Sequence, residues 1–521
     1  MSMSIFLFFV IACSSQPTTI DLALTNGHVY TKDGLQQTLY INNGLVIETP
    51  SSTVEILKEI NLEGKFILPS FHDAHTHLLA GAFVFDKLLL VGAMNMNTIR
   101  LRVKEYVNTS PDVPWVVGYG WIKSAIDAPT GIELDEVSGD YPVALFDSAG
   151  HSVLVNSKAM EIAGITADTP APDGGIIHRD SNGNPTGFLQ EAAIELISPL
   201  MVSQFSSDQL SSNLLSQISE FHQAGITSVS EILAVPGVNL TFPELYHQYE
   251  DLQFRVAYYV PLFAITELST VESFIGDQSE WVHFEGVKLW IDGSSGSGES
   301  WSIEESDIEE NHYGSQYFDT EELIKVVAHA ETHQYNLKLH VNGDAAVRSA
   351  LEALEYVQQS NGILNQEYLF EHAVLIAPSD YDRIYNLGIT VSIQPAHALV
   401  GIYGDQADHW QDERIDRAWD FPALEAAELN IAMGTDWPVW PTVDGLTNWQ
   451  TATEGLQSRN LKTLTVFNGY TSQGRTTSGL GHVGLNVGQE ADFIVLDGNP
   501  FEVSPNTISL QETWVKGMRV Y

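Results

Sequence analysis

Two histidines, His75 and His77, follow the apolar stretch 66–71 near the start of the chain. If this stretch is a β-strand, residues two apart point to the same side, so both imidazoles face one way. Neutral imidazole nitrogen is a common ligand for zinc and similar ions. The pair indicates part of a metal site, but histidines at this spacing are common, so further ligands must come from elsewhere in the chain.

The middle of the chain alternates predicted strands and helices, which is typical of parallel βα units. The apolar stretches predicted as strands are 66–75, 225–231, 254–260, 286–293, 337–341, 368–372, 389–394 and 430–436. Helices are predicted over about 207–224, 320–335 and 345–360. Eight such strands are the number in a (β/α)8 or TIM barrel, so the sequence predicts an α/β protein of this class.

Both ends of the chain are predicted to be rich in short strands. Asn26-Gly27 and Asp33-Gly34 separate alternating apolar runs, which is a hairpin signal. We predict a small β-sandwich from 20–66 and 466–521, flanking a barrel over 67–465. The first two barrel strands are separated by roughly 150 residues, far more than a crossover needs. Residues from about 82 to 205 are therefore expected to be an insertion that folds over the barrel mouth.

Six candidate ligands lie where a barrel of this type places its functional residues, at the C-terminal ends of strands. They are His75, His77, Lys288, His340, His372 and Asp436. His340 and His372 are 32 residues apart, about one βα unit, and His372 and Asp436 are 64 apart, about two. This agreement with the strand spacing is more specific than the His-x-His pair alone.

Short motifs occur along nearly the whole chain, at 68–77 (LPSFHDAHTH), 118–121 (GYGW), 150–151 (GH), 156–157 (NS), 187–191 (GFLQE), 287–293 (VKLWIDG), 340–345 (HVNGDA), 371–372 (EH), 394–397 (QPAH), 434–438 (GTDWP) and 488–496 (GQEADFIVL). These segments resemble the metal-dependent amidohydrolase superfamily, specifically its amidohydrolase-3 branch, which includes N-substituted formamide deformylase-like proteins. The resemblance covers about 21–521. It implies a barrel with a β-sandwich and one or two divalent metal ions, zinc by preference, at the barrel mouth.

The resemblance also implies a ligand set. One ion would be held by His75, His77 and Asp436, and a second by His340 and His372. A protonated lysine inside the barrel would repel metal and be costly to bury. The resemblance implies that Lys288 is instead carbamylated and bridges two ions. The alternative is a structural Lys288 paired with a carboxylate such as Asp292, with a single ion at the site.

The predicted chemistry is hydrolysis of a non-peptide C–N bond in an amide, N-formyl or N-acyl group of a small molecule. Metal lowers the pKa of bound water, and Asp436 would act as general base and then general acid. The alternatives are a mononuclear deaminase or esterase-type amidohydrolase, or a lipoprotein that binds a small molecule without catalysis. Residues in matched segments that would line the pocket, or be structural, are Trp121, His151, Glu191, Gln394 and His397. Histidines away from the strand ends, among them His329 and His333, are interpreted as ordinary surface or core residues.

The charge balance argues against nucleic acid as a partner. The chain has 23 Lys and Arg against 67 Asp and Glu, a formal net charge of −44. Such a surface repels nucleic acid and anionic lipid headgroups. We interpret the acidic excess as a solvated surface, and the sequence predicts no particular oligomeric state.

The one cysteine, Cys13, excludes an intrachain disulfide. It ends a short apolar run, and Val10-Ile11-Ala12-Cys13-Ser14 resembles the lipobox of bacterial lipoproteins. Residues 1–19 are therefore predicted to be a signal peptide and lipid anchor of an exported protein, on the periplasmic side or at the outer membrane. Residues 1–4 carry no Lys or Arg, unlike most signal peptides, and the alternative is a disordered tail on a cytoplasmic protein.

Overall fold

A computed structural model describes residues 19–521, except for 52–53, 85–86, 112, 148–149, 173, 203–206, 234–252, 307–309, 404–412, 441 and 482. The predicted lipidation site Cys13 lies outside the described residues, so lipidation and export stay predictions. Within the described ranges, no helix combines the length and the apolar character that a membrane span requires.

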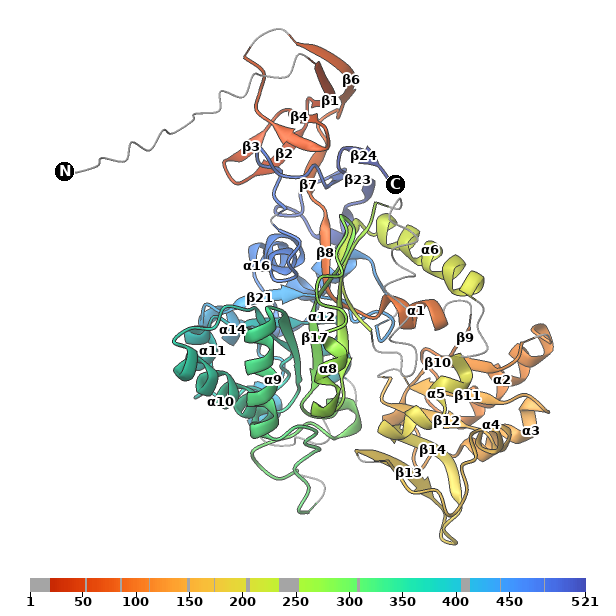
Figure 1. Cartoon of the computed structure of the whole chain (residues 1–521). Coiled ribbons are helices and arrows are strands. Elements are labelled where there is room, and N and C mark those ends of the chain that lie inside the picture. The colour runs from red at the N-terminus through yellow and green to blue at the C-terminus, as the bar shows by residue number, and fades with distance from the viewer. Residues whose placement is uncertain are drawn as a thin grey trace.

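Eight parallel strands form the centre of the molecule (Figure 1). In chain order they are β8 (Phe71–Thr76), β15 (Ile226–Ile232), β16 (Arg255–Leu262), β17 (Val282–Trp290), β18 (Asn336–Val341), β19 (Tyr368–His372), β20 (Thr390–Ile393) and β21 (Asn430–Met433). Each strand pairs with the next, and backbone hydrogen bonds from Asp436 to His75 and from His77 to Trp437, both 2.7 Å, join the last strand to the first. The predicted (β/α)8 barrel is confirmed.

The barrel strands are buried on both faces, because side chains fill the interior and helices cover the outside. All seven residues of β15 and all six of β18 are buried. Helices α6 (Ser207–Gln223), α9 (Thr320–His333) and α10 (Asp344–Asn361) lie where the apolar periodicity predicts them. Helix α9 begins at Asp319, whose carboxylate accepts the backbone N–H of Glu322 at 2.8 Å. Its apolar face joins the main core.

The two chain ends form a pair of small sheets beside the barrel, at the top of Figure 1. One sheet holds β5 (Leu45–Ile47), β4 (Leu39–Asn42), β1 (Thr19–Thr25) and β6 (Glu55–Asn61). The other holds β24 (Met518–Arg519), β23 (Leu510–Val515), β22 (Phe493–Leu496), β7 (Phe66–Pro69), β2 (His28–Thr31) and β3 (Gly34–Gln36). Apolar residues from both ends share one core, in which Phe493 and Trp514 stack. The predicted β-sandwich from both ends is confirmed.

The predicted first strand, 66–75, is two strands that belong to different sheets. β7 pairs with β2 and β22 in the sandwich, whereas β8 pairs with β15 in the barrel. The change occurs at Ser70, whose N–H donates to Asp492 at 3.2 Å, while the next N–H, of Phe71, donates to Gly225 at 2.9 Å. An apolar run that crosses between sheets without a loop carries no local signal of the crossing.

The predicted boundary between 465 and 466 falls inside a helix. α16 (Thr463–Asn468) spans it, and α17 (Gly474–Thr476) follows. Val466, Phe467 and Tyr470 are buried in the barrel core, so this segment packs with the barrel. The strands that the C-terminal region adds to the sandwich begin at β22.

The insertion has its own mixed sheet, at the lower right of Figure 1. Its strands, in the order in which they lie, are β13 (Gly175–Arg179), β14 (Pro185–Glu191), β12 (Ser152–Val155), β11 (Val143–Asp147), β10 (Val116–Trp121) and β9 (Leu88–Leu89). Val116 and Val117 point to opposite faces and join different apolar clusters. Both faces of this sheet are therefore covered.

Candidate metal centre

A cavity of about 410 Å³ opens at the C-terminal ends of the barrel strands. The insertion contributes Tyr119, Gly120 and His151 to its wall, as expected for a segment over the mouth. All six candidate ligands line it: His75, His77, Lys288, His340, His372 and Asp436. Of the five predicted pocket residues, His151, Gln394 and His397 also line it, whereas Trp121 and Glu191 do not.

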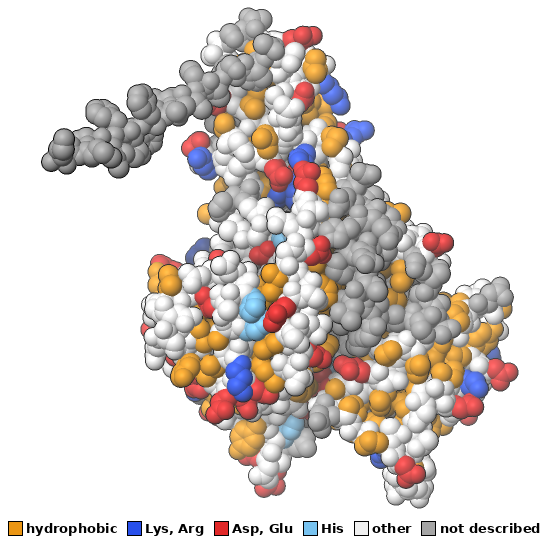
Figure 2. Space-filling view, viewed as in Figure 1, with side chains coloured by type: hydrophobic (Ala, Val, Ile, Leu, Met, Phe, Trp, Pro, Cys, Tyr) orange, Lys and Arg blue, Asp and Glu red, His pale blue; other side chains and the backbone are white. Residues whose placement is uncertain are grey.

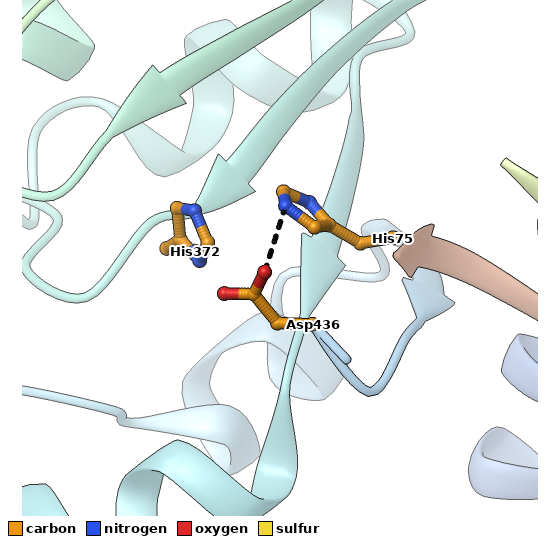
Figure 3. Close-up of side chains that lie close together, drawn as sticks. All are labelled: His75, His372 and Asp436. Atoms are coloured by element: carbon orange, nitrogen blue, oxygen red, sulfur yellow. Dashed lines mark ion pairs between the residues drawn. The ribbon is translucent and has the colours of Figure 1, made fainter. Parts of the chain in front are cut away.

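Three of the candidate ligands lie closest together (Figure 3). His75 is on β8, His372 ends β19, and Asp436 follows β21, and one possible ligand atom from each lies within 4.8 Å of the others. His75 Nε2 is 3.4 Å from Asp436 Oδ1. His372 and Asp436 have φ values of 69° and 59°, which residues other than glycine adopt rarely.

His75 and His77 are both oriented through their Nδ1 atoms. His75 Nδ1 donates to the Glu371 carboxylate, and His77 Nδ1 donates to the carbonyl oxygen of Ile232 at 3.0 Å. These bonds leave each Nε2 lone pair facing Asp436 Oδ1, at 3.4 Å from His75 and 3.0 Å from His77. Two imidazole nitrogens and a carboxylate oxygen this close together form a candidate binding site for a cation.

His340 and His372 continue the cluster, with ring centroids 4.6 Å apart. His372 Nδ1 donates to the amide oxygen of Gln394 at 2.7 Å, which again leaves Nε2 as the free lone pair. Among the described residues, four buried atoms of cavity-lining side chains have no hydrogen-bond partner: His340 Nδ1, Gln394 Nε2, His397 Nε2 and Asp436 Oδ1. Buried polar atoms without partners are costly, so this donor set fits a divalent metal of the zinc type.

Lys288, on β17, is 1% exposed. Within the described part of the chain it forms no hydrogen bond or ion pair, and its ammonium lies 5.3 Å from the Trp290 ring. Burial, together with the nearby Lys338, lowers the pKa of Lys288 to about 8, although Glu371 and Asp436 oppose the shift. The neutral amine form of this lysine is therefore populated at a lower pH than that of an ordinary lysine.

The alternative pairing of Lys288 with Asp292 is wrong. The Asp292 carboxylate instead accepts backbone N–H groups of Trp301, Asn342 and Gly343, at 2.7 to 3.0 Å. Burial raises the pKa of Asp292 to about 8 against the effect of these hydrogen bonds. The hydrogen bonds of Asp292 thus link the loop that follows β17 to the loop that follows β18.

A buried pair that the sequence reasoning missed, Lys338 and Glu371, supports the metal ligands. Lys338 Nζ donates to Glu371 Oε1 at 2.7 Å and to the Ala74 carbonyl at 2.8 Å. Burial alone would raise the pKa of Glu371, but Lys338 and His75 outweigh it and hold that pKa well below its usual range. Burial lowers the pKa of His75 to about 4, so its imidazole stays neutral. The sequence did contain a signal for Lys338. It is two residues before His340 in a predicted strand, so the two side chains lie on the same face of that strand.

His151 brings a charged group of the insertion to the cavity wall. Its Nδ1 donates to Glu191 Oε2 at 2.7 Å. Burial alone would lower the pKa of His151, but Glu191, helped by Asp147, raises it to about 9. Glu191 therefore acts behind His151 rather than in the cavity wall.

The predicted pocket position of Trp121 is wrong. Its side chain is fully buried in the core of the insertion, where Nε1 donates to the Leu145 carbonyl at 2.9 Å and the ring packs edge-on against Phe188. The flanking residues Gly120 and Ile122 line the cavity instead. The motif is at the mouth, but the direction of its tryptophan follows from the pleat of β10.

The comparisons with known proteins agree with this site. The profile of the amidohydrolase family matches residues 58–521. The chain belongs to the amidohydrolase family. With a candidate metal-binding group at the mouth of a barrel, it is a metal-dependent hydrolase whose family implies a small-molecule substrate.

Named relatives of this amidohydrolase are similar over nearly their whole length. Protein LONG AFTER FAR-RED 3 of Arabidopsis thaliana is 28% identical over 540 residues, covering 96% of this chain and 91% of the relative. N-substituted formamide deformylase of Arthrobacter pascens is 24% identical over 543 residues, covering 96% and 98%. A metal-dependent hydrolase from Pyrococcus horikoshii OT3 shares the fold, with a TM-score of 0.73, 22% identity and coverage of 93% and 99%.

Proposed function

We propose that this amidohydrolase hydrolyses a non-peptide C–N bond of a small amide, N-formyl or N-acyl compound, with zinc as its metal. The observation that carries the proposal is the convergence of His75, His372 and Asp436 at the base of the cavity, with Lys288 in the same wall. The choice of bond is supported by the N-substituted formamide deformylase relative, which aligns over 96% of the chain. Two imidazoles and a carboxylate are a donor set that zinc prefers.

We propose that Lys288 is carbamylated and supplies a further ligand. The neutral amine adds to carbon dioxide, a new N–C bond forms, and one proton is released, which leaves an anionic carbamate. Lys288 suits this reaction because it has no ion-pair partner in the described residues and its pKa is lowered to about 8. Lys338 is less suited, since its Nζ is already engaged by hydrogen bonds to Glu371 and to the Ala74 carbonyl.

We propose that Asp436 moves the proton of the reaction. A bound divalent ion supplies Lewis-acid activation of water and of the scissile carbonyl. Burial alone would raise the pKa of Asp436, but His75 and His77 hold it well below its usual range, so the carboxylate is ionised and has a free oxygen for a proton. Asp436 accepts the proton of the attacking water and passes it to the leaving nitrogen. The products are a carboxylic acid and an amine.

The rest of the cavity indicates how a substrate is held. Its wall is largely apolar and aromatic, with Trp290, Trp419, Phe421 and Trp440. His151, protonated through Glu191, is a cation in this wall and suits a carbonyl oxygen or a carboxylate of the substrate. A volume of about 410 Å³ is in the range of small-molecule sites.

The test combines metal content with a substrate panel. Wild type, Lys288→Ala and the exposed-lysine control Lys325→Ala are purified without chelator, with bicarbonate present, and assayed for metal per chain and for hydrolysis of N-formyl, N-acyl and ester compounds. We expect hydrolysis of the N-formyl or N-acyl compounds, and at least one equivalent of metal less in Lys288→Ala alone.

Other outcomes would separate the alternatives. Equal metal in wild type and Lys288→Ala would contradict the carbamate and favour a mononuclear site. Hydrolysis of esters without hydrolysis of amides would contradict the proposed bond. Metal binding without turnover of any compound would favour a non-catalytic binding protein.

A further inference from the structure

A second group of potential ligands lies on the outside of the barrel. It consists of Glu272, His329 and His333, and one possible ligand atom from each lies within 4.8 Å of the others. His329 and His333 are one turn apart on α9 and therefore share a face of the helix. Their rings stack with centroids 4.1 Å apart. Glu272 follows the short helix α8 (Leu268–Val271), and its Oε1 is 3.4 Å from His329 Nε2.

Tyr335 orients one of these imidazoles. Its hydroxyl oxygen is 2.8 Å from His329 Nδ1, and its side chain is 2% exposed. If Nδ1–H donates to the hydroxyl, the Nε2 lone pair of His329 faces Glu272. Histidines that bind metals characteristically donate the other ring N–H to an oxygen acceptor in this way.

The supporting helix is capped at its N-terminus and packed against the barrel. Helix α9 begins with a reciprocal pair of hydrogen bonds between Asp319 and Glu322, and Leu323 and Val326 fix its inner face in the barrel core. The two histidines therefore need little reordering to bind an ion, which reduces the entropic cost of binding.

The distances between the three side chains leave room for a metal ion. The 3.4 Å separation of His329 Nε2 and Glu272 Oε1 is longer than a normal N–H···O hydrogen bond. The Glu272 side chain is 51% exposed and that of His329 is 16% exposed, so water can complete the coordination of an ion. Figure 2 shows histidine side chains beside acidic ones on the face of the molecule over α9.

The group is separate from the metal centre at the mouth. His333 ends α9 shortly before β18 begins at Asn336, whereas His340 lies near the other end of that strand. The two sets of ligands therefore lie toward opposite ends of the same β-strand, and no residue belongs to both.

We propose that Glu272, His329 and His333 form a second binding site for a divalent transition-metal ion, with zinc as the expected occupant. Two imidazole nitrogens and one carboxylate oxygen favour zinc, copper or nickel over magnesium or calcium, which prefer oxygen ligands. An ion here links α8 to α9 across the outside of the barrel and stabilises the folded chain, because the unfolded chain does not hold the three ligands together.

The experiment measures zinc per chain by mass spectrometry after equilibrium dialysis in zinc-buffered solution. The proteins are wild type, His333→Ala, Tyr335→Phe and the control His178→Ala, a half-buried histidine of the insertion. Because the barrel mouth also binds metal, the readout is the difference from wild type in the same solution. We expect His333→Ala to hold one equivalent less and His178→Ala to hold the wild-type amount.

If His333→Ala folds poorly, the variant Tyr335→Phe still tests the proposal. Loss of the hydroxyl removes only the orienting contact and is expected to weaken zinc binding at this site about 10-fold or more. The same stoichiometry and affinity in wild type, His333→Ala and Tyr335→Phe would overturn the proposal. An equal loss in His333→Ala and His178→Ala would overturn the assignment to this group. Hydrolytic activity is measured in parallel, so failure of the outer site is distinguishable from failure of the mouth site.

Discussion

The metal centre at the barrel mouth and the group on α9 contain similar residues but are assembled in different ways. At the mouth, His75, His372 and Asp436 come from three strands and are at least 60 residues apart in the chain. On the outside, His329 and His333 are four residues apart on one helix. The first set exists only when the barrel closes, whereas most of the second exists as soon as α9 forms.

The two regions also differ in their surroundings. Asp436 is 4% exposed and His75 is 1% exposed, and the buried carboxylate of Glu371 holds His75. Glu272 is largely in solvent. A buried site strengthens electrostatic interactions and excludes water, which chemistry requires, while an exposed one suits an ion that only stabilises. The same ligand types therefore support different functions.

The largest expected effect is a loss of hydrolytic activity when the metal centre at the mouth is changed. Asp436→Asn removes the proposed proton acceptor and a candidate metal ligand, so kcat/KM is expected to fall by about 10³-fold or more. Steady-state kinetics with the best N-acyl or N-formyl substrate measures this loss. A change smaller than tenfold in a folded Asp436→Asn variant would contradict the role of Asp436.

The contribution of the buried Lys338–Glu371 pair is tested by the free energy of unfolding. Lys338→Met leaves the buried carboxylate of Glu371 without its ammonium partner, and breaking such a pair costs about 3–5 kcal/mol. Urea unfolding compares this variant with Lys325→Met, an exposed position where a change within about 0.5 kcal/mol is expected. Equal stability of the two variants would show that the buried pair contributes little.

A pH series tests the buried state of His75. The folded-state pKa of His75 is lowered to about 4, below the value of about 6.5 in an unfolded chain, so the unfolded state binds more protons between these values. Stability of the metal-free protein is therefore expected to fall as the pH drops from 6.5 to 4, and His75→Asn should show a shallower slope. Urea unfolding at several pH values measures the slopes, and equal slopes would contradict the prediction.

A smaller effect is expected at the insertion's contact with the cavity. Glu191→Gln removes the charge that holds His151 protonated, which is expected to raise KM about tenfold while kcat changes little. The measurement is a KM and kcat comparison with wild type across pH 6 to 9. An effect on kcat alone would place His151 in the chemical step instead.

The smallest effect is expected on the outside of the barrel. His333→Ala removes a ligand of the α9 group and none at the mouth, so kcat/KM should stay within about twofold of wild type. Kinetics at a fixed zinc concentration measures it. A tenfold loss would show that the two regions are coupled and would remove the distinction drawn between them.

The sequence predicted the barrel and the position of the candidate ligands at its mouth because both leave local signals. Buried parallel strands are continuous apolar runs, and a polar residue at the end of such a run lies at the mouth. All six candidate ligands line the cavity for this reason. Local patterns failed where one run served two sheets, as at Ser70, and where a helix continued the barrel past residue 465.

The amino-acid sequence by itself determined the order of the strands, the position of each ligand on its strand and the four-residue spacing of His329 and His333. Only the tertiary structure decided the partners: Glu371 with His75 and Lys338, Glu191 with His151, and no ion pair for Lys288 among the described residues. It also directed the Trp121 side chain into the insertion's core. The physical reason is that periodicity fixes the face on which a side chain lies, whereas its partner depends on which distant segment packs against that face.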